Sequence, residues 1–415
     1  MFSTRWRKVV RELWSNRTRT MLVIASIAVG IFAVGTVQLL RSVILSELKV
    51  IYAETNVAQA VIFTNGVDQD QLDAIGRMRE VADVQGRSTL ALKVQTKPDK
   101  QETLLVTSID DFKDIRINRI QPIFTMPSKP AVGAERTAWP GKDEIVIERS
   151  GFNSATALPA GLAVGDKLTL QNQDDRPRQV TLSGVVYDPN GFSANFTGQA
   201  TGYVDLDTFE RLGGARTFQQ VLVRVNGTPE QLLDKEYITS IANKVSDKIE
   251  KGGYTVARVQ VPEPGKLALQ DLFDALALLL TPLGLLALIL SGFLVINTIS
   301  ALMAQQVRQI GVMKAVGARR YQLFGMYLGA VLIYSVAALA VAVPLTIVVG
   351  GAIAVFLGGF INIDFPRWSL PPLVLALQLV VGLLTPLLAA VIPVFKGTGM
   401  TVREAVSDYG TNAEQ

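Results

Sequence analysis

The chain has 415 residues, carries a formal net charge of +4 and contains neither cysteine nor histidine. This composition excludes disulfides, thiol nucleophiles, Cys/His zinc sites and His-based triads, while carboxylate catalysis and Mg²⁺ or Ca²⁺ binding stay open. Residues 45–270 hold 26 basic and 29 acidic residues, so the basic excess lies in short segments beside apolar spans. That bias is typical of cytoplasmic loops in membrane proteins. The absence of a basic stripe with aromatic partners argues against nucleic-acid binding.

Residues 1–20 are basic and show helical spacing, which predicts an amphipathic helix on the cytoplasmic leaflet. Its membrane-facing residues are Trp6, Val9, Val10, Leu13 and Trp14. Residues 21–44 form the first expected transmembrane span, because about 20 apolar residues cross the hydrocarbon core. A cleaved signal peptide is the alternative, but residues 41–43 offer no small-x-small cleavage site.

Residues 45–270 are expected to form an extracytoplasmic domain that contains two β-α-β units. The predicted elements are strand 59–64, helix 69–79, strand 81–94, strand 219–225, helix 229–251 and strand 254–261. Two such units separated by an insertion predict one split α/β subdomain over 45–126 and 215–265. The insertion, 127–214, is rich in glycine, proline and short β runs, so we expect a small, mostly-β subdomain there.

Three further apolar spans are predicted, at 271–304, 323–360 and 370–395. Asn297 in the first of these is expected to hydrogen-bond to a neighbouring helix. The span 323–360 is more than about 50 Å long at 1.5 Å per residue. It is therefore either one helix, kinked at Pro344, that projects beyond the bilayer, or two short spans.

The fold class that follows is a membrane protein with four transmembrane α-helices and a large extracytoplasmic α+β domain between spans 1 and 2. Residues 361–369 form an extracytoplasmic loop, and residues 396–415 a cytoplasmic tail. The basic segments place both the amino and the carboxyl terminus in the cytoplasm, at the inner membrane of a bacterium.

The cytoplasmic link 305–322 is half apolar, has two glycines and carries no acidic residue. Ile310, Met313, Lys314 and Gly317 fall at helical spacing, which predicts a helix-turn with an apolar and a basic face. Such a segment is either a membrane-surface helix or a docking surface for a cytoplasmic partner.

Residues Arg308-Gln-Ile-Gly-Val-Met-Lys-Ala-Val-Gly-Ala318 resemble the R-E-I-G-x-x-K-A-x-G-A signature of FtsX-like and MacB-like ABC transporter permeases. The resemblance extends to Asn16–Leu22, Gly30–Gly35, Thr401–Tyr409 and the layout of one span, a large domain and three spans. The chain departs from the family pattern at Gln305, Gln306 and Gln309, where charged residues are common. Ion pairs with a partner at these positions are therefore in doubt, since glutamine only hydrogen-bonds.

The resemblance implies a homodimeric permease that binds a separate cytoplasmic ABC ATPase, membrane lipid and a periplasmic adaptor of membrane-fusion type. The chain has no Walker A motif, so it is expected to be no enzyme and to hold no cofactor or metal, ATP and Mg²⁺ being bound by the ATPase. The implied ATPase-coupling residues are Arg308, Ile310, Gly311, Met313, Lys314, Ala315, Gly317, Ala318 and Arg319.

The family's mechanism implies that the permease transmits ATPase motion to its extracytoplasmic domain, which drives export of a drug, peptide or lipid-like substrate. An FtsX-like regulator of an extracytoplasmic hydrolase is the alternative within the family. A membrane receptor is the alternative outside it, although a tail of about 20 residues holds no signalling domain. No Asp/Glu pair or Ser/Lys dyad in the spans indicates a membrane enzyme.

Overall fold

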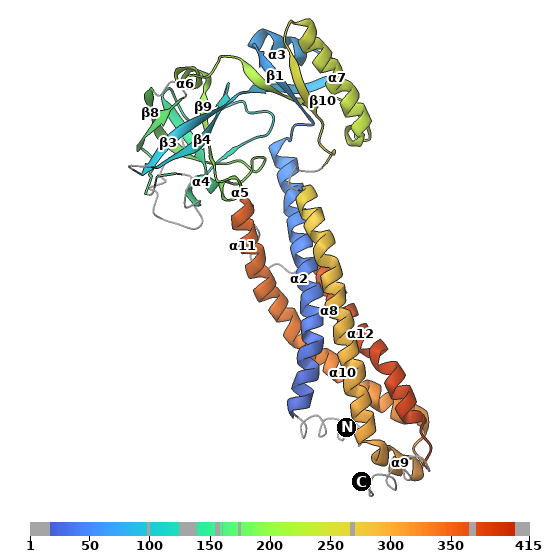
Figure 1. The fold of residues 1–415 in the computed structure, drawn as a ribbon. Helices are drawn as coiled ribbons and strands as arrows, with labels where there is room; N and C mark the ends of the chain where they lie inside the picture. The colour runs from blue at the N-terminus through green and yellow to red at the C-terminus, as the bar shows by residue number, and fades with distance from the viewer. Residues whose placement is uncertain are drawn as a thin grey trace. The chain divides into compact units, whose positions relative to one another are not determined.

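The computed structural model describes residues 17–97, 100–123, 139–153, 158–159, 161–172, 176–265, 270–364 and 371–402. The chain divides into two compact units (Figure 1). The helical unit comprises Met1–Ile44, Leu272–Val355 and Phe365–Gln415, and the sheet unit comprises Leu45–Asp271 and Phe356–Asp364. The predicted membrane-surface residues Trp6, Val9, Val10, Leu13 and Trp14 lie outside the described residues.

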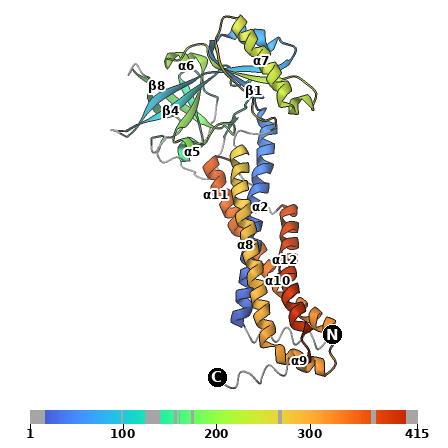
Figure 2. The ribbon, with the colours of Figure 1, turned by 45° about the vertical axis from the view of Figure 1, so that its right-hand side comes forward.

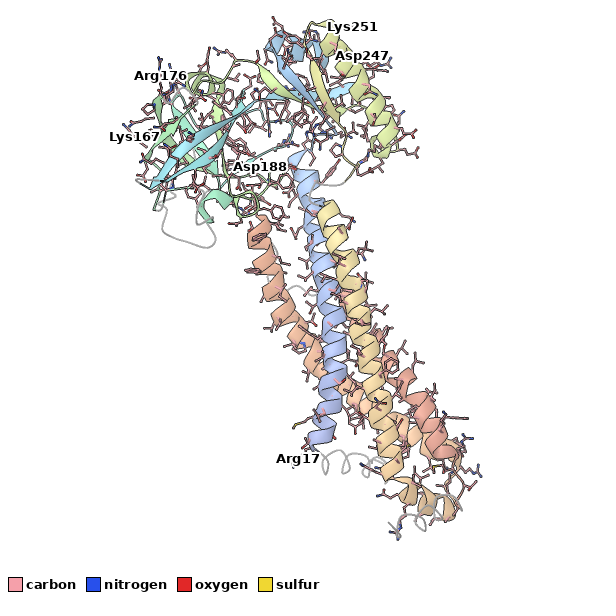
Figure 3. All side chains as sticks on the ribbon, viewed as in Figure 1. Arg17, Lys167, Arg176, Asp188, Asp247 and Lys251 are labelled. Carbon is pink, nitrogen blue, oxygen red and sulfur yellow. The ribbon has the colours of Figure 1, made fainter. Side chains whose placement is uncertain are left out.

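Within the described residues, four helical segments are long and apolar enough to cross a membrane. They are α2 (Arg17–Thr55), α8 (Gln270–Gln305), the segment Arg320–Ile361 and α12 (Pro372–Gly399). Residues 278–305 of α8 contain no charged side chain. In Figure 3, the labelled charges other than Arg17 lie in the sheet unit. The four helices and the α+β domain between the first two confirm the predicted fold class.

The segment Arg320–Ile361 is one continuous helix, so the alternative of two short spans is wrong. It consists of α10 (Arg320–Leu345), a π-helical turn η2 (Thr346–Gly350) and α11 (Gly351–Ile361). Pro344 removes one backbone donor, and the wider turn begins two residues later, at Thr346. A proline followed by such a turn distorts a helix without ending it.

In the helical unit, α2 and α8 run side by side (Figure 2). The helices of this unit approach closely at small residues. A Cβ on Gly30 would lie 2.9 Å from the Cβ of Ser291 in α8. A Cβ on Gly35 would overlap Gln378 of α12, whose buried amide donates to the Thr346 hydroxyl at 2.8 Å. Both glycines therefore serve contacts inside this chain. The expected hydrogen bond of Asn297 to a neighbouring helix is not found among the described residues, where this side chain is exposed.

A four-stranded antiparallel sheet in the order β11-β1-β10-β2 forms one part of the sheet unit. Its strands are β1 (Ala60–Val67), β2 (Val81–Arg87), β10 (Phe218–Val225) and β11 (Val256–Gln260). The helices α3 (Gln69–Gly76) and α7 (Lys235–Lys251) share one core with it. Since β1 lies between β10 and β11, the two β-α-β units interleave as the split-subdomain prediction required.

The second part is a seven-stranded mixed sheet in the order β5-β8-β6-β9-β4-β3-β7. Because β7 also pairs with β8, the sheet closes on itself around an apolar core. Its strands are β3 (Thr89–Lys97), β4 (Lys100–Ile109), β5 (Gln121–Pro122), β6 (Glu144–Glu148), β7 (Lys167–Gln171), β8 (Pro177–Tyr187) and β9 (Ala200–Asp205). Short helices α4 (Ser150–Asn153), α5 (Ala194–Thr197), α6 (Leu206–Arg211) and η1 (Gln231–Leu233) complete the sheet unit.

The structure corrects the predicted strand 81–94 and the start of the insertion at 127. Residues 81–97 form two strands, β2 and β3, which belong to different sheets. Ser88 lies between them, with its N–H and C=O bonded to Ser108 of β4. Its hydroxyl donates to the carbonyl of Thr217, just before β10, and accepts the N–H of Gln219 in β10. The mostly-β part therefore begins at Thr89, because the partners of β3 and β4 come from later in the chain.

Candidate coupling site

The segment 305–322 forms a helical corner. Gln306 precedes α9 (Val307–Ala315), and Arg319 precedes α10. The Gln306 side chain is buried, and its Oε1 accepts a hydrogen bond of 2.6 Å from the Tyr327 hydroxyl. This glutamine, one of the three departures from the family pattern, thus stabilises the corner from inside.

The α9 helix ends in a Schellman motif that requires glycine. Gly317 has φ +99°, a left-handed conformation that side chains with a Cβ rarely adopt. The Ala318 N–H donates to the Met313 carbonyl and the Gly317 N–H donates to the Lys314 carbonyl, both at 2.9 Å. These two bonds satisfy carbonyls that the helix end leaves open and fix the angle between α9 and α10.

Burial divides the predicted coupling residues into two sets. Ile310 is 1% exposed and belongs to the core of the helical unit together with Met303 and Leu323. Gly311 is buried, whereas Met313 and Ala318 are partly buried against the same core. The remaining side of α9 and its turn faces outward, with Arg308, Ala315, Gly317 and Arg319 exposed.

The sequence reasoning missed three exposed apolar or aromatic residues at the corner. Val316 is 84% exposed, and Val312 and Tyr321 are also largely exposed. We call Arg308, Val312, Val316, Arg319 and Tyr321 the corner surface. The i, i+4 spacing of 308, 312 and 316 was the signal that could have found it.

Two basic side chains fasten the corner to the end of α12. The Lys314 Nζ donates to the carbonyl of Met400, the residue that caps α12. The Arg320 Nη2 donates to the Phe395 carbonyl at 3.0 Å, and its guanidinium lies 4.0 Å from the centre of the Phe395 ring. Cations are favourable at a helix C-terminus, where unpaired carbonyls carry negative partial charge. Lys314, predicted as a coupling residue, thus positions α9 against α12.

Comparisons with known proteins give one family match and several solved structures. Residues 283–402 match the model of the FtsX-like permease C-terminal family. No curated protein matches the chain. The extracellular domain of the noncanonic ABC-type transporter YknZ from Gram-positive bacteria aligns at 12% identity and a TM-score of 0.31, covering 48% of this chain and 100% of that one.

The periplasmic region of MacB from Actinobacillus actinomycetemcomitans aligns at 10% identity and a TM-score of 0.30, covering 48% of this chain and 87% of that one. The family match includes α9 and the whole corner surface. The resemblance to FtsX-like permeases is thereby confirmed over this part of the chain.

Proposed function

We propose that this chain is the permease subunit of an ABC-type export system in a bacterial inner membrane. A separate cytoplasmic ATPase, which binds ATP and Mg²⁺, docks on the corner surface, and its motion passes through the helices to the sheet unit. The observation that carries the proposal is the corner surface, within the region that matches the FtsX-like family. Exposed apolar groups beside cations form the kind of patch that marks a protein interface.

The anchoring of the corner supports its use in transmission. Ile310 joins α9 to the core, while Lys314 and Arg320 join the corner to α12. A force applied to Val316 or Arg319 would therefore act on several helices together. The basic side chains would favour an acidic surface on the ATPase and speed its association.

The lengths of two helices support the proposed direction of transmission. The α2 helix has 39 residues and the segment Arg320–Ile361 has 42. At 1.5 Å per residue each is about 60 Å long, roughly twice the hydrocarbon thickness. Each runs from the helical unit into the sheet unit, because the boundary between the units falls within α2 and within α11. We place the sheet unit outside the cytoplasm and both termini inside, as the basic segments favour.

Asn297 supports a homodimer. Its side chain is exposed on α8, within the uncharged stretch that is expected to lie in the membrane, and no described residue bonds its amide. An unpaired amide in hydrocarbon is unfavourable, and pairing with a second copy would satisfy it. Asn297→Leu should reduce the dimer fraction in lipid nanodiscs, whereas Ser300→Ala, an exposed change one turn away, should not. An unchanged dimer fraction in Asn297→Leu would refute this contact.

The output of the permease is proposed to be export of a drug, peptide or lipid-like substrate, aided by a periplasmic adaptor of membrane-fusion type. An FtsX-like regulator of an extracytoplasmic hydrolase would share the corner surface but would bind a hydrolase in place of an adaptor. Mass spectrometry of the proteins that co-purify with the chain from its host distinguishes these outputs.

The experiment for ATPase docking compares two substitutions of exposed apolar residues. Val316→Asp changes the corner surface, and Leu233→Asp makes the same chemical change on the sheet unit. We expect Val316→Asp to abolish co-purification of a P-loop ATPase from mild detergent, while Leu233→Asp retains it. Retention of the ATPase by Val316→Asp, or no ATPase with the unaltered chain, would contradict the proposal.

A further inference from the structure

Two helices of this chain end in the same unusual way. Asn56 follows the last residue of α2 and Asn362 follows the last residue of α11, with φ values of 56° and 65°. Asparagine is among the few residues other than glycine that adopt this left-handed conformation. In each case an arginine of the sheet unit donates to the asparagine Oδ1: Arg224 of β10 bonds Asn56, and Arg149 after β6 bonds Asn362.

The contacts of Asn362 form a buried network that we call the Asn362 clasp, made of Glu148, Arg149 and Asn362. The Asn362 Nδ2 donates to Glu148 Oε1 at 2.6 Å. Arg149 Nε donates to Asn362 Oδ1 at 2.7 Å, and its Nη2 donates to the Asn362 carbonyl at 3.0 Å. The Glu148 Oε2 accepts the Ser150 N–H at 2.8 Å. Both carboxylate oxygens of Glu148 and both polar atoms of the Asn362 side-chain amide are thus hydrogen-bonded.

The clasp lies in an enclosed environment. Glu148 is 4% exposed and Asn362 is 6% exposed, and the Arg149 guanidinium lies 3.9 Å from the centre of the Tyr187 ring. Beside it, Asn195 Nδ2 donates to the Gly359 carbonyl and Phe196 packs edge-on against Phe360. Buried networks that satisfy every polar group are rigid, because an alternative arrangement leaves a charge or an amide unpaired. The end of α11 is therefore held firmly against β6 of the seven-stranded sheet.

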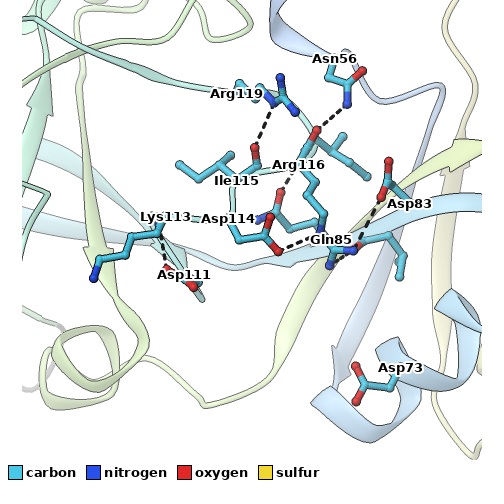
Figure 4. Close-up of polar contacts among 12 residues, drawn as sticks. Asn56, Asp73, Asp83, Gln85, Asp111, Lys113, Asp114, Ile115, Arg116 and Arg119 are labelled. Carbon is cyan, nitrogen blue, oxygen red and sulfur yellow. Dashed lines mark hydrogen bonds and ion pairs between the residues drawn. The ribbon is translucent and has the colours of Figure 1, made fainter.

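The contacts of Asn56 reach the four-stranded sheet at Arg224 of β10 and through residues 116–118, which connect β4 to β5 and contact β2. The Asn56 Nδ2 donates to the Arg116 carbonyl at 2.7 Å, and Arg116 reaches Asp83 of β2 at 3.6 Å (Figure 4). The Asn118 N–H donates to the Asn56 carbonyl, and the Asn118 Oδ1 accepts the Ala58 N–H. With Arg224 on β10, these groups form the Asn56 clasp, which joins α2 to the four-stranded sheet.

We propose that the two long helices are attached at different places. The α2 helix is attached through the Asn56 clasp to the four-stranded sheet and to the β4–β5 connection that contacts it, and α11 is attached to the seven-stranded sheet through the Asn362 clasp. An axial shift of one helix against the other then changes the angle between the sheets, with Ser88, between β2 and β3, as a hinge. That an ATPase supplies the shift rests on the proposed function, whereas the two attachments do not.

The test uses the full-length chain in lipid nanodiscs. Since the chain has no cysteine, spin labels attached to Phe356→Cys and Gln179→Cys report one distance between α11 and β8 of the seven-stranded sheet. Both positions are exposed. If the Asn362 clasp is intact, we expect double electron–electron resonance to give a single narrow distribution of the distance between the two labels.

A reciprocal exchange of the two side chains distinguishes loss of the Glu148–Asn362 hydrogen bond from general destabilisation of the fold. Glu148→Gln places two amides opposite each other, and Asn362→Asp places two carboxylates opposite each other, so each single variant should lose the narrow distance. In the double variant the new amide donates to the new carboxylate, and Ser150 and Arg149 keep their acceptors. We therefore expect the narrow distance to return. A double variant as broad as the single ones would overturn the assignment.

Two further variants isolate the cause. Asn362→Gly keeps the left-handed conformation but removes the side chain, so it should also lose the narrow distance. Arg216→Lys, in an exposed ion pair with Asp207, is the matched control and should leave the distance unchanged. A narrow distance in Asn362→Gly would show that the helix end is not fastened by this side chain.

The independence of the two attachments is measured with a second label pair, at Val50 of α2 and Asp247 of α7, both exposed. In Asn362→Gly this distance should stay as narrow as in the unaltered clasp. If Asn362→Gly broadened the distance distributions of both label pairs, the separate attachment of the two helices would be refuted. No ATPase is present in these measurements, so their outcome is independent of whether the ATPase docks.

Discussion

The two ends of the helix Arg320–Ile361 are built in opposite ways. At its start, Lys314 and Arg320 hold neighbouring carbonyls, while Val316 and Tyr321 remain largely exposed. At its other end, the buried Asn362 bonds Glu148 and Arg149 from a distant part of the chain. An exposed mixed surface suits a partner that binds and leaves. A closed network suits permanent attachment within the chain.

The largest effect that tests this contrast is expected at Arg149. Arg149→Ala leaves the buried Asn362 Oδ1 and the Asn362 carbonyl without the guanidinium donor, and each such unsatisfied group typically costs about 1–3 kcal/mol. The free energy of opening, measured by hydrogen exchange at β6 in the full-length chain, should fall accordingly. Arg216→Ala, which removes an exposed arginine, should cost about 1 kcal/mol or less. Equal losses in the two variants would mean that the Asn362 clasp is no stronger than a surface ion pair.

The second effect separates the buried anchor of the corner, Ile310, from the exposed corner surface. Ile310→Ala creates a cavity in the core and should destabilise α9 by about 2–5 kcal/mol. Val312→Ala, on the exposed side of the same helix, should change its stability by about 0.5 kcal/mol or less. Hydrogen exchange of the α9 amides measures both. If Val312→Ala increased the exchange of these amides as much as Ile310→Ala, the division between the buried anchor and the exposed corner surface would be wrong.

The third effect concerns the turn of the corner. Gly317→Ala adds a Cβ that meets nothing within 4 Å, so its cost is backbone strain alone, about 1–2 kcal/mol at this positive φ. Gly325→Ala is the matched control, because its Cβ also meets nothing but the residue lies within α10. It should stabilise the helix by about 0.5–1 kcal/mol. Thermal unfolding in detergent should therefore shift in opposite directions; a shift in the same direction would argue against the Schellman turn.

The smallest effect is a pH dependence at the Asn362 clasp. Burial raises the pKa of Glu148, and the nearby Asp188 adds to the rise, while hydrogen bonds from Ser150 and Asn362 oppose it. Between the ordinary and the raised pKa the native state binds more protons than the unfolded state, so stability falls as pH rises through that range. Protection of β6, corrected for intrinsic exchange, should be greater at the acidic end. Protection that increases with pH would contradict this sign.

The sequence predicts features that local patterns encode. Continuous apolar runs give the four spans, and alternating residues give most strands. The division at Ser88 could not be predicted, because it depends on bonds to Ser108 and Thr217. The Asn362 clasp joins residues 214 positions apart, and no local pattern encodes such a pairing.

The orientation of Lys314 shows the same limit within the candidate site. The motif includes this residue, yet its hydrogen bond depends on the Met400 carbonyl at the end of α12, which lies far along the chain. From the sequence, the segment with Pro344 could form either one long span or two short ones. The structure shows one helix, which continues after Pro344 through a π-helical turn. Helix packing and backbone distortion decide these points, and neither follows from periodicity.

The central claim is that a shift between two helices becomes a movement between two sheets. The most direct measurement is the distance between spin labels at Gln179 of the seven-stranded sheet and Asp247 beside the four-stranded sheet, in the complex with the co-purified ATPase. The account predicts that ATP shifts this distance, and that Asn362→Gly abolishes the shift while ATP hydrolysis continues. If ATP did not change this distance, or if Asn362→Gly showed the same shift as the unaltered chain, the central claim would be contradicted.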